Sequence, residues 1–437
     1  MSSIQFDERL KQYGVKPDSK HYKLFSKANL LENIDYDYID EIQSYWIKHY
    51  KKKINPLVHI AYHNLLGKKD VRIMPTSVMW NKIIPFFNDM FIRPGYSDKN
   101  LYDRLVDTEN RPETVLKRVH GNYFDSNNTD INREQAEKIL IAMQQDLIIK
   151  PSNADNGRGV GKIYHRQGKL YYNNKHVSII DLEKELGHNF IVQKVIQQHP
   201  MMAEPHPASV NTLRMVTFRW KGKIQHLLTY ARFGGGNNVK DHAIHGGVSV
   251  SVDDDGVLGD YGLDTYLRVH THHPTTNFSF KDNKIQIPNY KYFIEFVENL
   301  HKNILHHDFV SWDIAVGIDG QPVFIEPNFR GTSWRYQLAS KKPIFGDLTE
   351  EVLEYVSDQL NNDGYFRSGE YDIKKLIKAN EKLKKRLESR DQELKRKNKE
   401  IKELNKEINS YKVELNNIKS SKSWKITKPL RQISRKF

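Results

Sequence analysis

The spacing of apolar and polar positions divides the chain into regions of different periodicity. Residues 1–95 are polar with helical spacing, which predicts a mostly helical N-terminal region. Over residues 96–365, short apolar runs typical of strands alternate with helical patterns, which predicts an α+β domain. The strand-like runs are LIIKP, NFIVQKVI, RMVTFRW, IQHLLTYARF, DIAVGI and PVFIEP, and the helical ones are EQAEKILIAMQQD, YKYFIEFVENLHKNIL and DLTEEVLEYVSDQL.

A heptad repeat begins after the breaker at residues 361–364 and predicts a coiled coil over residues 371–418. Eleven of its fourteen seam positions are apolar, and Asn380 is a polar seam residue of the kind that fixes register. We expect the helices to associate in parallel, which would gather their basic ends at one membrane face; a single solvated helix is the alternative. The seam positions are Ile373, Leu376, Asn380, Leu383, Leu387, Arg390, Leu394, Lys397, Ile401, Leu404, Ile408, Tyr411, Leu415 and Ile418.

Residues 419–437 form a basic amphipathic tail. It places bulky apolar side chains among lysines and arginines, a composition that suits an anionic membrane surface. A frayed basic tail without that role is the alternative. The apolar residues are Trp424, Leu430, Ile433 and Phe437.

The net charge of +14 belongs to the C-terminal part of the chain. Residues 371–437 carry 22 Lys and Arg against 9 Asp and Glu, whereas the other 370 residues carry 46 against 45. A nearly neutral globular part gives no reason to expect a nucleic-acid partner. Cysteine is absent, which excludes disulfides and cysteine nucleophiles and fits a reducing compartment. With neither a signal-peptide pattern nor a membrane-spanning run, we expect a cytoplasmic protein.

An acidic pair on a predicted hairpin is the strongest chemical signal. Asp319-Gly320 predicts a two-residue turn, which would place Asp313 directly opposite Glu326 and leave Asn328 on the face of Glu326. Two carboxylates and an amide oxygen brought together in this way suit Mg²⁺ held jointly with phosphates. A surface hairpin with solvated acids is the alternative.

A glycine-rich loop supplies a second signal. The apolar run LIIKP ends with Lys150, and Gly157, Gly159 and Gly161 follow before another strand-like run. Glycines let backbone N–H groups approach phosphate oxygens, and a lysine offers them a positive charge. The loop lacks the ending of a Walker A motif, and a plain hairpin loop is the alternative.

Taken together, these features resemble the ATP-grasp superfamily. The segments QQHPMMAEPHPASVNTLRMVTFR, GGGNNVKDHAIHGGVSVSVDDDG and DIAVGIDGQPVFIEPN are similar to the sugar-transfer-associated ATP-grasp family, over about residues 40–360. The resemblance implies two α+β subdomains that clasp ATP, with Mg²⁺ bridging the protein and the phosphates.

The resemblance also implies roles for individual residues. The metal ligands would be Asp313, Glu326 and Asn328. The nucleotide would contact Lys99, Lys150, Gly157, Gly159, Gly161 and, at the adenine hinge, Gln193 and Lys194. The phosphoryl group or the substrate carboxylate would contact Arg214, Arg232 and Arg330, and the substrate cleft would hold His199, His242 and His245. Structural salt bridges of the strand arginines, and ordinary strand ends at the hinge, are the alternatives.

The expected function is that of an ATP-dependent carboxylate–amine ligase that forms an acyl-phosphate. Its substrate would be a small molecule or a lipid-linked sugar in cell-surface polysaccharide synthesis. We expect a homo-oligomer formed through the coiled coil, with peripheral contact to the inner face of the cell membrane. Two alternatives are an ATP-dependent kinase or other transferase acting on a sugar hydroxyl, and a noncatalytic scaffold.

Overall fold

The computed structural model describes residues 6–423 apart from residues 155–158, 237–245, 332 and 362–372. It contains two compact units, Met1–Arg367 and Ser368–Phe437. The predicted basic tail lies outside the described residues from residue 424 onwards. Among the residues that are described, no helix is long and apolar enough to cross a membrane.

Short helices make up the N-terminal part of the first unit. Asp7, Ser19 and Asp35 cap three of them, each accepting a hydrogen bond from a backbone N–H in the first turn. Their buried side chains enter two separate cores. Leu10, Tyr22 and Phe25 lie in one, and Trp46 lies in the other, where its indole N–H donates to the Val71 carbonyl at 2.9 Å. The elements are η1 (Glu8–Tyr13), α1 (Lys20–Lys27), α2 (Tyr36–Tyr50), α3 (Leu57–Leu66), α4 (Thr76–Val78), η2 (Met79–Ile83), α5 (Ile84–Phe87), α6 (Arg93–Tyr96), η3 (Lys99–Leu101) and α7 (Tyr102–Leu105).

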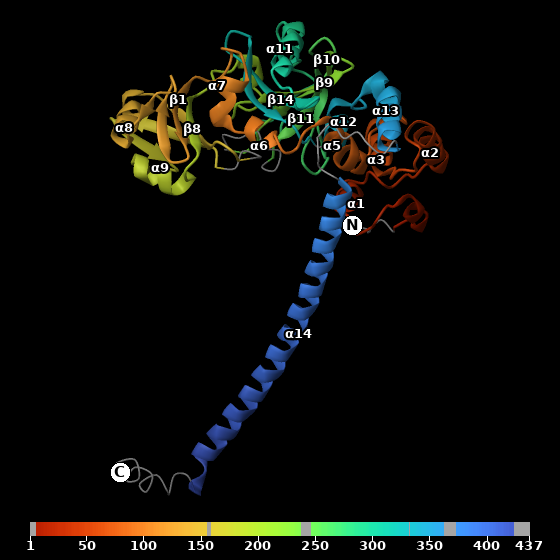
Figure 1. The fold of residues 1–437 in the computed structure, drawn as a ribbon, viewed down its shortest axis with the longest axis vertical. Helices are drawn as coiled ribbons and strands as arrows, with labels where there is room; N and C mark the ends of the chain where they lie inside the picture. Colours follow the sequence, from red (N-terminus) through yellow and green to blue (C-terminus); the bar gives the residue numbers. More distant parts are fainter. Residues whose placement is uncertain (1–5, 155–158, 237–245, 332, 362–372, 424–437) are drawn as a thin grey trace. The chain divides into compact units, whose positions relative to one another are not determined.

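The first sheet has eight antiparallel strands in the order β3-β2-β1-β8-β4-β5-β6-β7. Two helices, α8 (Arg133–Ala142) and α9 (Ile179–Leu186), lie against it, and a common apolar core fills the space between (Figure 1). The strands are β1 (Thr114–Val119), β2 (Asn122–Asp125), β3 (Asp130–Ile131), β4 (Leu147–Pro151), β5 (Gly161–Arg166), β6 (Lys169–Tyr172), β7 (Lys175–His176) and β8 (Phe190–Lys194).

The second sheet has seven antiparallel strands in the order β13-β12-β11-β10-β9-β14-β15. Its strands are β9 (Thr212–Trp220), β10 (Lys223–Phe233), β11 (Val248–Val252), β12 (Leu258–Leu263), β13 (Val269–His270), β14 (Phe309–Val316) and β15 (Pro322–Asn328). The remaining helices of this unit are α10 (Pro200–Ala203), α11 (Tyr290–Lys302), α12 (Ser333–Ser340), η5 (Gly346–Leu348) and α13 (Thr349–Asn361).

Helices cover both faces of this second sheet. Trp312 and Ile314 point into a core shared with α11, whereas Phe309 and Phe218 point into a core shared with α2, α5 and α13. Side chains two residues apart on a strand share a face, so Asp313 lies on the same face as Phe309. Asp313 therefore lies on the same face of the second sheet as the apolar residues that pack against α2, α5 and α13.

The hairpin of β14 and β15 has the predicted pairing but not the predicted turn. Gly317 N–H donates to the Gln321 carbonyl at 2.8 Å, so the tip is a three-residue loop that ends with Gly320 at φ +77°. This tip shifts the pairing by one residue, and a bulge at residue 325 restores it, so that Asp313 does oppose Glu326. The predicted two-residue turn was wrong.

The need to bury Phe324 explains the bulge. Phe324 pairs with Ile314 and packs 6.2 Å from the Trp312 ring, on the apolar face towards α11. In a regular strand Phe324 and Glu326 would share one face, since they are two residues apart. The extra residue lets Phe324 enter the core while Glu326 faces Asp313.

In the second unit, the structure describes a single long helix, α14 (Ile373–Ser420). Its 48 residues span the predicted heptads, and the described apolar seam side chains are exposed. Association of this helix with another copy stays a prediction.

Candidate functional site

A row of polar side chains crosses four strands of the second sheet. Glu326 on β15 opposes Asp313 on β14, Asp313 opposes Arg214 on β9, and Arg214 opposes Tyr230 on β10. Arg232 is two residues beyond Tyr230 and therefore lies on the same face. Two of the three predicted metal ligands and two of the three predicted arginines thus lie in one place.

Two arginines hold Asp313, which is only 6% exposed. Arg232 Nη1 donates to both carboxylate oxygens at 3.0 and 3.1 Å, and Arg214 Nη2 donates to Oδ2 at 3.0 Å. Burial alone would raise the pKa of Asp313, but the charges of Arg214 and Arg232 keep that pKa below its ordinary value. The salt bridges that the sequence left as an alternative are present.

A hydroxyl pair extends this network towards Asn328. Arg214 Nη1 donates to the Tyr336 hydroxyl at 3.0 Å, which lies 2.7 Å from Ser311 Oγ, and Ser311 in turn donates to the Asn328 carbonyl at 3.2 Å. Neither hydroxyl group was predicted from the sequence. Ser311 could have been found from its position two residues before Asp313, but Tyr336 comes from α12, and no local pattern points to it.

Two buried lysines meet Glu326 from outside the second sheet. Lys99 Nζ lies 3.2 Å from a Glu326 oxygen and donates to the Ala154 carbonyl at 3.1 Å. Lys150 comes from β4 of the first sheet, and the two lysines are only 6% and 8% exposed. Burial and then the charge of Lys99 lower the pKa of Lys150 to about 8, while Glu326 opposes the shift. Lys99 therefore pairs with Glu326, and Lys150 lies close enough for the charges of both to affect its pKa.

A cavity of about 400 Å³ opens beside Glu326. Arg330 lies at its edge with its guanidinium 5.7 Å from the centre of the Trp80 ring, and the Trp80 indole N–H donates to the Gly331 carbonyl at 2.7 Å. Nothing in the sequence pattern singled out Trp80. The lining residues are Trp80, Arg93, Ser97, Lys99, Tyr102, Glu326, Pro327, Asn328, Phe329 and Arg330.

The described glycines of the predicted phosphate loop have structural reasons to be glycine. Gly159 has φ +72°, and a Cβ there would lie 2.7 Å from Pro151. A Cβ on Gly161 would lie 2.3 Å from the Tyr172 ring. Gly157 lies outside the described residues.

The predicted hinge residues lie at the end of β8. Gln193 Nε2 donates to the Pro112 carbonyl at 3.3 Å, and Lys194 Nζ lies 2.6 Å from a Glu113 oxygen. The Lys194 backbone N–H donates to the Glu113 carbonyl at 2.9 Å. The side chains of both residues therefore have partners within the protein.

The predicted cleft histidines are only partly described. His199 is the N-cap of α10, where its ring accepts a hydrogen bond from the Met201 N–H at 3.3 Å. His242 and His245 lie outside the described residues.

Comparison with known proteins decides the family. The model of the sugar-transfer-associated ATP-grasp family matches residues 80–352, more than half of the chain. The chain belongs to the sugar-transfer-associated ATP-grasp family. The resemblance seen in the sequence is thereby confirmed, and so is the ATP-grasp fold of two α+β parts with a helical N-terminal region. Membership makes the chain an ATP-grasp enzyme.

Solved structures resemble this ATP-grasp chain only weakly. The VanG D-Ala:D-Ser ligase from Enterococcus faecalis is 16% identical, with a TM-score of 0.38, and the match covers 62% of this chain and 63% of the ligase. For the D-alanine–D-alanine ligase from Bacillus anthracis the identity is 13%, the TM-score 0.36 and the coverage 67% and 78%. No curated protein matches the sequence. The family assignment therefore rests on the family model.

The residues of this ATP-grasp site fit a nucleotide phosphate chain with a divalent cation. Lys150 has no hydrogen-bond or ion-pair partner for its side chain among the described residues, and the buried Asn328 Nδ2 likewise has none within the described structure. No group of three or more His, Asp or Glu side chains that could hold a metal occurs in the described ranges. A cation here would therefore be held by few protein oxygens together with phosphates, as is usual for Mg²⁺.

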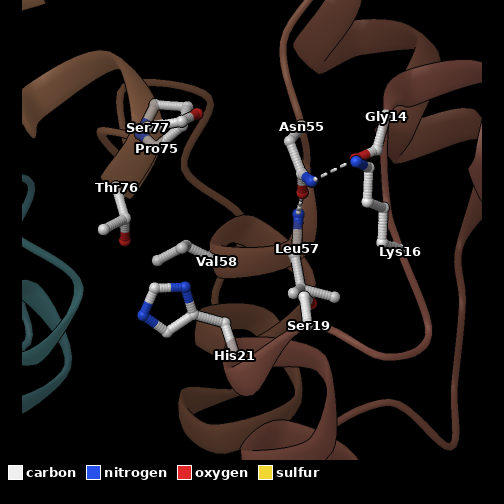
Figure 2. Close-up of a pocket in the computed structure, with 10 residues that line it drawn as sticks. All are labelled: Gly14, Lys16, Ser19, His21, Asn55, Leu57, Val58, Pro75, Thr76 and Ser77. Atoms are coloured by element: carbon white, nitrogen blue, oxygen red, sulfur yellow. Dashed lines mark hydrogen bonds between the residues drawn. The ribbon is translucent and has the colours of Figure 1, made fainter. Parts of the chain in front are cut away.

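A second, smaller cavity lies in the N-terminal helical region. Figure 2 shows His21 and Thr76 on one side of it and Lys16 and Asn55 on the other. Its volume is about 150 Å³, and burial lowers the pKa of His21. None of the predicted site residues lines this cavity.

Proposed function

We propose that this protein is an ATP-dependent carboxylate–amine ligase whose nucleotide phosphates bind beside Glu326. The observation that supports this most directly is the convergence of Lys99 and Lys150, two buried ammonium groups, on one carboxylate. The single carboxylate of Glu326 balances only one of these two buried cations, and a triphosphate would supply the further negative charge.

The proposed roles follow from position. Lys99 and Lys150 bind phosphate oxygens, and Glu326 and Asn328 hold Mg²⁺ at the cavity. Both oxygens of Asp313 already accept hydrogen bonds from arginines, so Asp313 would hold the cation only if one of these hydrogen bonds were released. Bound Mg²⁺ neutralises phosphate charge.

Of the other predicted residues, Arg330 lines the same cavity. Arg330 at the cavity edge binds the substrate carboxylate, and Arg214 and Arg232 stabilise the charge that develops on the phosphoryl group. The end of β8 at Gln193 and Lys194 holds adenine. The glycine loop with Gly157, Gly159 and Gly161 covers the phosphates.

The proposed reaction has two steps. A carboxylate oxygen of the substrate attacks the γ-phosphorus of ATP, the bond from that phosphorus to the β–γ bridging oxygen breaks, and ADP leaves. An amine then attacks the carbonyl carbon of the acyl-phosphate, phosphate leaves, and the nitrogen loses a proton as the amide forms. Positioning and charge neutralisation account for the catalysis, so no side-chain nucleophile is required.

The description of the family as sugar-transfer associated supports a glycan substrate. We propose that the acceptor is a lipid-linked sugar or a cell-surface polysaccharide precursor, modified at the cytoplasmic side of the membrane. The basic residues of the C-terminal part support a position at an anionic surface.

Hydroxylamine trapping tests the reaction type. The full chain is incubated with Mg²⁺, ATP, hydroxylamine and a panel of amino acids and uronic acids, and hydroxamate and ADP are measured. A ligase gives ADP and hydroxamate with one of the acids, because hydroxylamine captures the activated acyl group. ADP release with a phosphorylated sugar hydroxyl and no hydroxamate would instead identify a kinase.

Two variants connect the result to the site. Glu326→Gln should abolish hydroxamate formation. Glu295→Gln on the exposed face of α11 is the matched control and should retain it. Full activity of the Glu326 variant would refute the proposed metal position.

A further inference from the structure

Helix α14 exposes an apolar stripe along its length. Its described seam residues Leu383, Leu387, Leu394, Ile401, Leu404, Ile408, Leu415 and Ile418 are 48–66% exposed. They are separated by three, four or seven residues, so they form one stripe on the helix surface. At 1.5 Å per residue, the 48 residues span about 72 Å, which is long for a helix whose described side chains, from residue 380 onwards, are all exposed.

We propose that α14 pairs with α14 of a second copy of this chain in a parallel, in-register, two-stranded coiled coil. This inference does not depend on the proposed activity. The apolar stripe would be covered by the same stripe of a second copy, and the charged residues that flank the seam support this pairing.

The flanking charges suit a parallel, in-register pair. In that arrangement, a residue just before one seam row faces the residue five positions later on the other helix. Arg386 then faces Asp391, Glu407 faces Lys412, and Glu414 faces Lys419 of the second copy. The intervening glutamates, Glu393 and Glu400, face Asn398 and Asn405, so no flanking pair of the described residues carries like charges.

An antiparallel pair fits these charges less well. With the two helices fully overlapped, Glu393 faces Glu400 and Arg386 faces Glu407, each of them twice, so the repulsive pairs equal the attractive pairs in number. Asn380 also favours the parallel pair, because only there does it meet its own copy in the seam and exchange amide hydrogen bonds.

Two seam layers oppose the pairing. Arg390 and Lys397 would each face their own copy. Lys397 Nζ lies 3.8 Å from Glu393 of the same helix, which offsets part of its charge, and the long aliphatic stems of both residues can cover the seam. The apolar layers from Ile401 to Ile418 are therefore the part that holds the two helices together.

Light scattering of the full chain tests the association. The expected mass is twice the 51.3 kDa of one chain at micromolar concentration. Ile408→Glu puts a charge into the seam and should give the single-chain mass. Val413→Glu is the matched control, because Val413 is 61% exposed but lies outside the seam, and this variant should remain double.

Cysteine cross-linking tests the direction. The chain has no cysteine, so only an introduced thiol can react. Leu415→Cys should form a disulfide-linked dimer on mild oxidation, since parallel in-register helices bring the two copies of this position together. Val413→Cys should not. A single-chain mass for the unmodified protein, or a double mass that survives Ile408→Glu, would overturn the proposal. A dimer in which Leu415→Cys fails to cross-link would overturn the parallel arrangement.

Discussion

Nucleotide affinity should fall as the pH rises through 8, because Lys150 then loses its proton in the free protein. Its pKa lies at about 8 instead of 10.5, since burial and Lys99 disfavour the charged form. A bound phosphate favours the charged form and raises the pKa towards its ordinary value. Binding above pH 8 must therefore take up a proton, and this costs affinity.

The size of the effect follows from that pKa. At pH 9 roughly one free molecule in ten keeps the Lys150 proton, so the apparent Kd should be about tenfold higher than at pH 7, where nearly all molecules are protonated. The same shift affects folding with a defined sign. Between pH 8 and 10.5 the unfolded chain binds more protons at this lysine, so its contribution to stability rises with pH.

Calorimetric titration with a non-hydrolysable ATP analogue at fixed Mg²⁺ and ionic strength measures the effect. Lys150→Met removes the titrating group. This variant should bind the nucleotide more weakly, but its Kd should not show the rise above pH 8 that Lys150 causes. Its pH profile therefore gives the part of the pH dependence that comes from ionisation of the nucleotide itself. Lys150→Arg stays charged and should lack the same loss. A wild-type Kd whose pH profile matches that of Lys150→Met would refute the placement of Lys150 on the phosphates.

Further predictions concern the acidic pair and the glycine loop. Asp313→Asn leaves two buried arginines without their counter-charge and should lower the free energy of unfolding by about 3–5 kcal/mol in a denaturant titration. Glu326→Gln removes the carboxylate beside the buried Lys99, so it should lower the free energy of unfolding by about 1–3 kcal/mol, and it should also remove the Mg²⁺ dependence of nucleotide binding. Gly161→Ala should destabilise the protein by about 1–3 kcal/mol through the Tyr172 ring, measured as a lower Tm, and Tyr172→Leu in the same chain should relieve most of that loss.

Local patterns were enough to predict the acidic pair. The alternation of residues around Asp313 and Glu326 depends only on strand period and turn position, both of which are visible in sequence. The turn itself was wrong by one residue, because the sequence does not show that Phe324 packs against Trp312. The prediction of the pairing held because the bulge compensates for the longer tip.

Contacts between distant segments could not be predicted in this way. The convergence of Lys99 and Lys150 on Glu326 joins a short helix to strands of two different sheets. Tyr336 reaches Arg214 from a helix more than a hundred residues away in sequence. Such contacts depend on how the sheets and helices pack, which periodicity does not specify. The arginine salt bridges were weighed as an alternative because Arg214 and Arg232 alternate with apolar neighbours.

The bulge in β15 makes the site depend on a phenylalanine that does not touch it. A two-residue tip without a bulge would use the same number of residues, and it would pair Phe324 with Ala315 instead of Ile314, on the polar side of the strand. The burial of one aromatic ring thus selects between two slipped forms of the hairpin. A polar substitution at Phe324 would weaken the preference for the observed register. A loss of activity in that variant would then reflect a shift of the β15 register by one residue, and not a missing contact to substrate.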